Sequence, residues 1–146
     1  MAGLSLLLYP TVSDFWNSLH QSRAIAGYDE AVASLDQESY EEYWNQAVAY
    51  NERLWHKSSR YYLTDEEQEE YRSMLNISGN GIMGYIQIPS INVSLPIYHG
   101  TDESILQVAV GHIEASSLPV GGESTHCVMS GHRGLPSARL FTDLDQ

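Results

Sequence analysis

The sequence predicts an α+β fold, with helices in the first half of the chain and strands in the second. Residues 12–75 carry apolar side chains at helical spacing and two capping signals headed by serine or threonine. From Ile82 the apolar residues recur with the two-residue period of a strand. Turn-forming residues at 76–81 separate the two patterns. Because neither half alone would bury much apolar surface, we expect helices and sheet to pack as one domain.

The composition fits a single globular domain with a strongly negative net charge. The chain has 146 residues, of which 42% are hydrophobic. Nineteen acidic residues against seven Lys and Arg give a net charge of −12, which opposes binding to nucleic acid and attracts any basic partner. The lone cysteine, Cys127, cannot form an intramolecular disulfide. The apolar start, Leu4 to Tyr9, is far shorter than the ~20 residues of a membrane-spanning helix.

Two helices are expected before residue 60. The first runs from about Val12 to Ala26 and ends at Gly27. The second begins at a capping box, Ser39 to Glu42, and continues to about Lys57. One face of this second helix is apolar and aromatic, which is typical of core packing, although an aromatic platform for a ligand is the alternative. Its members are Tyr43, Trp44, Ala47, Tyr50, Leu54 and Trp55.

A third helix begins at a second capping box, Thr64 to Glu67, and ends near Leu75. Its acidic run, Asp65 to Glu70, has two interpretations. Acidic side chains at a helix start complement the positive end of the helix dipole, whereas clustered carboxylates can also bind calcium. The alternating Asp pattern of a calcium loop does not occur in the sequence, which favours a solvated helix face.

The second half of the chain predicts short strands separated by turns. Strands are expected at Met83 to Ile88, at Ile91 to Tyr98 with an interruption at Pro96, and at Gly111 to Ile113. One or two helical turns are expected over residues 102–108. A further strand is expected over residues 126–130, followed by a short helical turn over 138–144 that Ser137 would cap.

His132 is the strongest candidate for a catalytic residue. It follows the apolar run that ends at Ser130 and lies between Gly131 and Gly134, which permit a tight turn. An imidazole with an ordinary pKa of ~6.5 can exchange a proton near neutral pH, so it could assist a thiolate or protonate a leaving group. A histidine that only caps a turn is the alternative.

Four segments in the same order resemble a pilus-assembling class C sortase. They are Gly84 to Pro89, Leu95 to Thr101, Leu118 to His126, and Ser130 to Leu144, the last of which contains Gly131-His-Arg-Gly134. The opening segment Gly3 to Ser13 is also similar to the part of these enzymes that leaves the membrane. The resemblance identifies His132 as the catalytic histidine and implies that helices precede a sortase-type β-barrel, here incomplete.

The resemblance also implies how the chain is organised. Residues 1–10 would be the remnant of a membrane-anchor exit segment, 11–81 the helical layer, and 82–146 the first part of the barrel, in one domain with the helices. The catalytic Cys and Arg of the family lie on later strands, and the Thr-Leu-x-Thr-Cys motif does not occur in this sequence. We therefore expect this chain to be the N-terminal portion of a catalytic domain, inactive by itself.

Cys127 is close to His132 in sequence but is a poor candidate for the nucleophile. The two residues are five positions apart, so in a continuous strand their side chains would point to opposite faces. A thiol in an apolar run such as 127–129 is usually a buried small hydrophobic group. The resemblance agrees, because the family's nucleophile belongs to a later strand.

Two further groups of residues are candidates for the site. His112, Glu114, His126 and His132 could bind a metal from adjacent strands, but their spacing matches no established metal motif, which favours structural or incidental histidines, and we expect no metal or cofactor. Arg133 and Arg139 could stabilise an oxyanion. In a strand, the Arg133 side chain would point to the face opposite His132. The resemblance also implies that the family's catalytic arginine lies on a late strand, so we reject both arginines as oxyanion donors.

Class C sortases typically cover their active site with a lid that carries an Asp-Pro-aromatic tripeptide. The sequence has no such tripeptide, and Trp55 to Tyr62 is the only aromatic segment in a comparable place. The resemblance therefore does not decide whether this chain has a lid.

The function implied by the resemblance is transpeptidation. A sortase of this class cleaves an LPxTG-like sorting signal and links pilin subunits through a lysine amine, on the extracellular face of the membrane of a Gram-positive bacterium. The expected partners are pilin subunits, together with either a C-terminal fragment of the same protein or a second copy that exchanges strands; nucleic acid is not expected. The alternative is a non-enzymatic fragment or protein-interaction module.

Overall fold

The computed structural model describes residues 2–59 and 61–145, with side chains described from residue 7 onward. Helices occupy the first half of the described chain and strands the second, which confirms the α+β prediction. The helices are α1 (Ala2–Ala33), α2 (Gln37–His56), α3 (Asp65–Ser73) and the short α4 (Glu103–Leu106). The strands are β1 (Ile82–Ile88), β2 (Val93–His99), β3 (Val110–His112), β4 (Met129–Ser130), β5 (Arg133–Leu135) and β6 (Ala138–Leu140), with a 3-10 turn, η1 (Pro89–Ile91), between β1 and β2.

The strands form a four-stranded sheet and a separate hairpin. The sheet has the order β1-β2-β3-β4, in which β2 and β3 are parallel and the other two pairs are antiparallel. β5 and β6 pair with each other, with Arg133 opposite Leu140. The hairpin follows β4 directly, so the two-residue segment between β4 and β5 joins the sheet to the hairpin.

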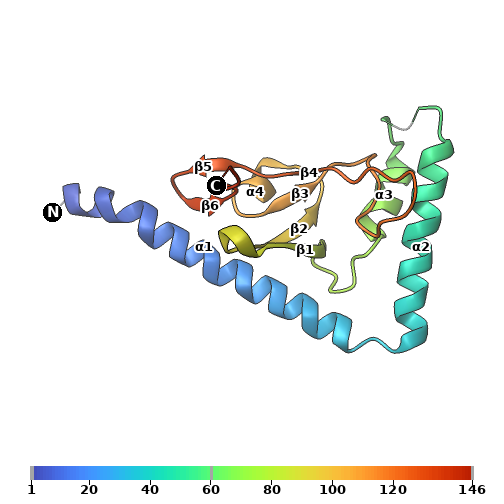
Figure 1. Cartoon of the computed structure of the whole chain (residues 1–146), viewed down its shortest axis with the longest axis horizontal. Coiled ribbons are helices and arrows are strands. Elements are labelled where there is room, and N and C mark those ends of the chain that lie inside the picture. The colour runs from blue at the N-terminus through green and yellow to red at the C-terminus, as the bar shows by residue number, and fades with distance from the viewer. Residues whose placement is uncertain (1, 60, 146) are drawn as a thin grey trace.

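The helices pack on the strands from two sides. Figure 1 shows α1 running along one side of the sheet, α2 standing across its end, and α3 between α2 and the strands. The first part of α1 is tied to the hairpin, because the Ser137 carbonyl accepts hydrogen bonds from Ser13 Oγ (3.1 Å) and Asn17 Nδ2 (2.7 Å), while Asp14 Oδ1 accepts one from the Arg139 amide (2.7 Å). Nearer its end, the Tyr28 hydroxyl donates to the Met83 carbonyl of β1 (3.2 Å).

One hydrophobic core joins the second and third helices to both groups of strands. Ala47, Tyr50 and Leu54 supply the buried face of α2, so these three positions of its predicted stripe do serve core packing. The other members of this core are Tyr71, Met74, Leu75, Met83, Leu95, Ile97, Val110, Leu118, Ala138 and Leu140. Residues of the sheet and of the hairpin thus contribute to one core.

α1 is longer than the sequence pattern predicts at both ends. The expected limits of Val12 and Gly27 were wrong, because the helix includes Pro10 and continues through Gly27 to Ala33. The residues before Pro10 are mostly Leu and Ala, which favour helix, so the loss of one backbone donor does not end it. Beyond Gly27, the Tyr28 hydrogen bond to β1 fixes the helix on the sheet. Among the described residues, no helix has the length and apolar character required to cross a membrane.

The starts of α2 and α3 test the two predicted capping boxes. The prediction at Ser39 was wrong, because α2 is capped by Asp36, three residues earlier, whose carboxylate accepts a hydrogen bond from the Ser39 amide (2.8 Å). The prediction at Thr64 was right. Thr64 Oγ1 accepts from the Glu67 amide and the Glu67 carboxylate accepts from the Thr64 amide, so the reciprocal capping box is present.

Two strand predictions and one helix prediction were wrong. Pro96 does not interrupt β2, because it pairs with Tyr85 of β1 and lies one residue before the pairing with β3 begins. The strand expected over residues 126–130 is reduced to Met129–Ser130, since the His126 and Val128 amides donate to the side-chain hydroxyls of Ser117 and Ser116 in place of strand carbonyls. The helical turn expected after Ser137 is instead β6, in which Ala138 and Leu140 alternate into the core.

Candidate active site

His132 lies in the two-residue connection between β4 and β5. Its side chain is half-buried, and its Nε2 atom is buried without a hydrogen-bond partner in the described structure. Its backbone carbonyl accepts a hydrogen bond from the Phe141 amide (3.3 Å), which ties the connection to the end of the hairpin. A buried ring nitrogen is normally paired, so an unpaired one marks a group that is available to a substrate or to a second catalytic residue.

The two glycines beside His132 have different structural roles. A Cβ at Gly131 would lie 2.6 Å and 2.7 Å from two ring atoms of Phe141, so the ring occupies the space that a side chain would need. Gly134 has a φ of +75°, the left-handed conformation that glycine adopts at little cost. The sequence predicted permissive backbone at both positions, but the close approach of Phe141 to Gly131 could not be read from it.

Arg133 and Arg139 are both engaged with acidic residues near the end of the described chain. Arg133 Nη2 donates to Asp145 Oδ2 (2.7 Å), and this bond lowers the pKa of the Asp145 carboxyl. Arg139 Nε donates to Asp143 Oδ2 (2.7 Å). Both arginines are exposed. Each forms a surface ion pair, which gives neither of them the arrangement of an oxyanion donor.

Cys127 lies before β4 in a segment without regular strand geometry. The expectation that it would be buried was wrong, because the residue is exposed. The parity argument also loses its basis, since no continuous strand joins residues 127 and 132. Desolvation nevertheless raises the pKa of the Cys127 thiol, whereas a reactive cysteine requires a lowered pKa. The structure therefore gives this thiol no activating environment.

The proposed metal ligands do not converge. His112 is fully buried, with Nδ1 2.9 Å from the Tyr71 hydroxyl and Nε2 2.9 Å from the Ser117 carbonyl, so both nitrogens are engaged. His126 is exposed and Glu114 half-buried. In residues 2–59 and 61–145, no group of three or more His, Cys, Asp and Glu side chains is placed to bind a metal ion.

Tyr71 is a structural residue that the sequence pattern does not reveal. Its hydroxyl contacts His112 Nδ1, donates toward the His112 carbonyl (3.1 Å), and accepts from the Gly100 amide (3.1 Å). Burial raises the pKa of the Tyr71 phenol and lowers that of His112, which keeps both groups neutral. This network joins α3, the end of β3 and the turn after β2. An isolated aromatic residue in a short helix carries no signal that would have identified it.

The chain is similar to known sortases. A model of the sortase domain matches residues 86–146. Sortase D of Bacillus subtilis is 46% identical over 50 residues, covering 34% of this chain and 24% of that protein. Sortase C1 of Streptococcus agalactiae matches with a TM-score of 0.80 and 50% identity, covering 84% of this chain and 64% of that one. Sortase C of Streptococcus pneumoniae matches with a TM-score of 0.71 and 44% identity, covering 84% and 62%.

The domain match and the shared fold relate the chain to the sortase family. Within the family, the two streptococcal structures relate it to the class C enzymes. The match spans just under two thirds of each streptococcal chain and about a quarter of the Bacillus protein.

Proposed function

We propose that this chain is the N-terminal portion of the catalytic domain of a cysteine transpeptidase that cleaves an LPxTG-like sorting signal and links pilin subunits through a lysine amine. The observation that carries the proposal is the position of His132, which lies between two strands of a sortase fold with an unpaired, buried Nε2. The reported structure of the S. pneumoniae relative concerns catalysis and pilin substrate specificity. A membrane-anchored enzyme on the extracellular face of a Gram-positive cell would meet such substrates.

His132 would act on the proton of the leaving amine. In the first step a cysteine thiolate attacks the threonine carbonyl of the sorting signal, and His132 gives a proton to the amine nitrogen as the peptide bond breaks. In the second step the lysine amine of another subunit attacks the thioester, loses a proton to His132, and releases the thiolate. The nucleophilic cysteine and the arginine that stabilises the oxyanion would come from strands that follow this chain.

The test replaces His132 in a polypeptide that also contains the nucleophile-bearing strand. A fluorogenic sorting-signal peptide reports cleavage, and a melting curve reports folding. His132→Ala is expected to lower kcat/KM by at least about 100-fold, because a general acid contributes at least that much. His126→Ala, which removes an exposed histidine six residues away, is the matched control and should retain activity. A folded His132→Ala variant with an undiminished rate would contradict the proposal.

The 146-residue chain alone should not turn over the same peptide. Its one thiol, Cys127, has a raised pKa and therefore little thiolate at neutral pH. Incubation of the chain and of its Cys127→Ala variant with the peptide tests this directly. Turnover that disappears in Cys127→Ala would show that Cys127 is a nucleophile and would overturn the assignment of this role to a later strand.

A further inference from the structure

Each ring nitrogen of His99, the last residue of β2, lies beside a backbone carbonyl oxygen. Nδ1 is 2.9 Å from the Gly81 oxygen, and Nε2 is 2.7 Å from the Met74 oxygen. A carbonyl oxygen can only accept a hydrogen bond, so each nitrogen must carry a hydrogen to bond its partner. The neutral imidazole has one such hydrogen, whereas the imidazolium has two. Both hydrogen bonds together therefore require the charged ring.

The two carbonyls lie at the ends of the connection between α3 and β1. Met74 is the C-terminal cap of α3, and Gly81 directly precedes β1. Carbonyl groups at the end of a helix lack partners within the helix and carry the negative end of its dipole, which favours a cation there. The His99 ring thus joins the end of α3 to the sheet. We refer to this ring and its two carbonyl partners as the His99 clasp.

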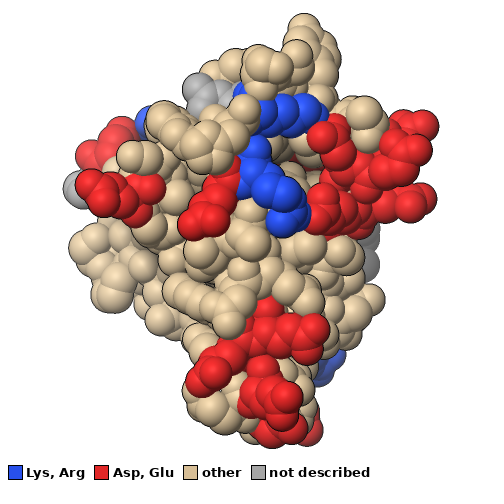
Figure 2. Space-filling view, turned by 90° about the vertical axis from the view of Figure 1, so that its right-hand side faces the viewer, with Lys and Arg blue, Asp and Glu red and all other residues tan. Residues whose placement is uncertain are grey.

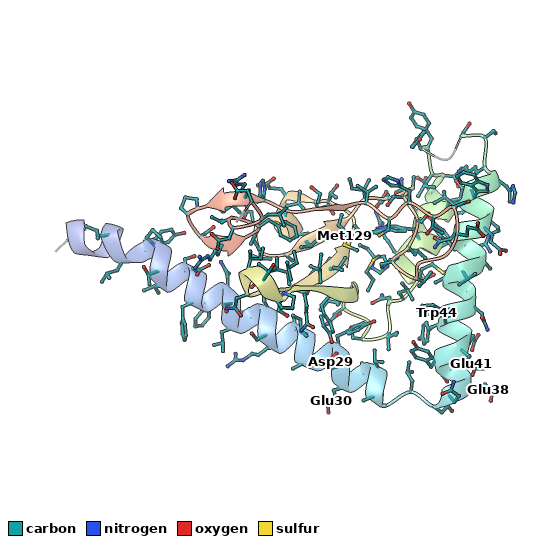
Figure 3. The ribbon with its side chains drawn as sticks, in the orientation of Figure 1. Asp29, Glu30, Glu38, Glu41, Trp44 and Met129 are labelled. Atoms are coloured by element: carbon teal, nitrogen blue, oxygen red, sulfur yellow. The ribbon has the colours of Figure 1, made fainter. Side chains whose placement is uncertain are left out.

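The His99 clasp lies at the end of the sheet that faces α3. His99 is opposite His112 in the pairing of β2 with β3, and His112 is opposite Met129 of β4, so Met129 marks this end of the sheet in Figure 3. The Tyr71 ring of α3 meets His99 edge to face, with centroids 5.1 Å apart, and stacks with His112 at 5.7 Å. Burial, and then the charge of His99, lower the pKa of His112. One histidine is thus kept neutral while the other is placed to be charged.

Ionisable side chains of α3 and of the segment that follows β3 lie around the His99 clasp. Burial raises the pKa of the Tyr71 phenol, which therefore contributes no charge. Glu114 lies close by, since its Oε1 atom is 3.7 Å from the position that a Cβ at Gly100 would take. Its carboxylate supplies a negative charge on this side, which favours an imidazolium. The connection over residues 74–81 has no ionisable side chain in its sequence.

We propose that the His99 clasp is a pH-sensitive device that holds the end of α3 and the start of β1 against β2 while the ring is doubly protonated. When the ring loses one hydrogen, a nitrogen lone pair faces a carbonyl oxygen, and that contact changes from attractive to repulsive. The positive charge at the end of α3 is lost in the same step. Protonation of His99 therefore stabilises the fold, so its contribution is present at low pH and decreases as the pH rises. The effect has the opposite sign to that of His112 and is independent of catalysis at His132.

The first experiment compares urea unfolding of the full chain and of His99→Gln between about pH 5.5 and about pH 8.5, at one protein concentration. The glutamine amide is a neutral donor that takes up no proton in this range. We expect the loss in midpoint urea concentration to be at least about twofold larger at the acid end of the range than at the alkaline end. A loss that stays constant or grows with pH would overturn the proposal.

His126→Gln is the matched control, because it removes an exposed histidine and leaves the His99 clasp intact. Its midpoint should differ from that of the unmodified chain by the same amount at every pH. Figure 2 shows exposed acidic side chains gathered in separate groups, with a few basic ones between them. Their titration is common to all three proteins and cancels in each difference. A control that reproduces the pH dependence of His99→Gln would overturn the proposal.

The second experiment observes His99 directly and does not depend on a variant that folds. At about pH 6.5, where an ordinary histidine is half protonated, NMR of the ring nitrogens in the full chain reports whether each of them carries a hydrogen. We expect a hydrogen on both nitrogens of His99, because each faces a carbonyl oxygen. An unprotonated nitrogen on His99 at this pH would overturn the proposal.

Discussion

Gly131 shows how one absent side chain shapes the candidate active site. The Phe141 ring occupies the space that a side chain at this position would need, and the Phe141 amide donates to the neighbouring His132 carbonyl. Together these contacts fix the backbone on both sides of the imidazole. The position of His132 therefore depends on a packing contact across the hairpin as well as on the turn itself.

Gly131→Ala is expected to destabilise the fold by about 1–3 kcal/mol, because its Cβ would overlap the Phe141 ring and force it to move. Gly27→Ala is the matched control. Gly27 lies inside α1 with nothing within 4 Å of a Cβ, so alanine there should stabilise the chain by about 0.5–1 kcal/mol. Denaturant unfolding measures both changes. Combining Gly131→Ala with Phe141→Leu should recover part of the loss, and a neutral Gly131→Ala would contradict the contact.

His112 should resist protonation in the folded chain. Its pKa is lowered, first by burial and also by the charge of His99, while the Ser117 carbonyl acts in the opposite direction. The unfolded chain binds a proton near pH ~6.5 and the folded chain only at lower pH, so the stabilisation is complete above ~6.5 and is lost as pH falls toward the folded pKa. NMR titration of the ring carbons tests this, and a midpoint at or above the ordinary value would contradict it.

At the scale of elements, the sequence predicted types better than boundaries. The period change at Ile82 located β1, and the Thr64 box located α3, because both signals are local. The conversion of 138–144 into β6 depends on contacts between α1 and the hairpin, 120 or more residues apart in sequence, and the extension of α1 beyond Gly27 is accompanied by the bond from Tyr28 to β1. No local pattern encodes such contacts.

The candidate site shows the same difference between features encoded by local sequence and features that depend on tertiary contacts. His132 could be singled out because glycines and an apolar run bracket it in sequence. The ring of Phe141 beside Gly131, the exposure of Cys127 and the Tyr71 network depend on tertiary packing. The strand expected over residues 126–130 failed for a related reason, since Ser116 and Ser117 bind that segment through side-chain hydroxyls in place of a regular strand partner.

The cap of α2 can be tested against the residue that the sequence favoured. Asp36→Ala is expected to lower Tm by about 3 °C, because its carboxylate accepts the Ser39 amide at the helix start. That hydrogen bond also lowers the pKa of Asp36, so its benefit is present at neutral pH and is lost as acid protonates the carboxyl. Ser39→Ala should have a smaller effect. A larger loss for Ser39→Ala in differential scanning calorimetry would restore Ser39 as the cap.

At the scale of the whole molecule, the sheet has two edges in the described structure. β1 pairs only with β2, and β4 pairs only with β3. Strand edges carry backbone donors and acceptors that can pair with another chain. Met129, the first residue of β4, and Val128, just before it, are only half-buried. Both features favour association through this edge.

We expect the 146-residue chain to be stable as a dimer through edge pairing or strand exchange, or together with a C-terminal fragment of the same protein that completes the sheet. The net charge of −12 should slow unspecific aggregation without preventing specific pairing. Sedimentation at several concentrations, with mass spectrometry of the same sample, measures this. A folded, strictly monomeric 16.4 kDa species with no accompanying peptide would contradict the expectation.

α1 has a mechanical consequence for a protein tethered at its N-terminus. Its 32 residues span about 48 Å at the usual helical rise, and Figure 1 shows its first turns projecting beyond the strands. Tension applied there would run along the helix axis and load the bonds from Ser13, Asp14 and Asn17 to the hairpin side by side, in shear. Bonds loaded in parallel share a force, whereas bonds loaded one after another break in turn. The hairpin that follows His132 is thereby anchored to the part of the chain that would carry the pull.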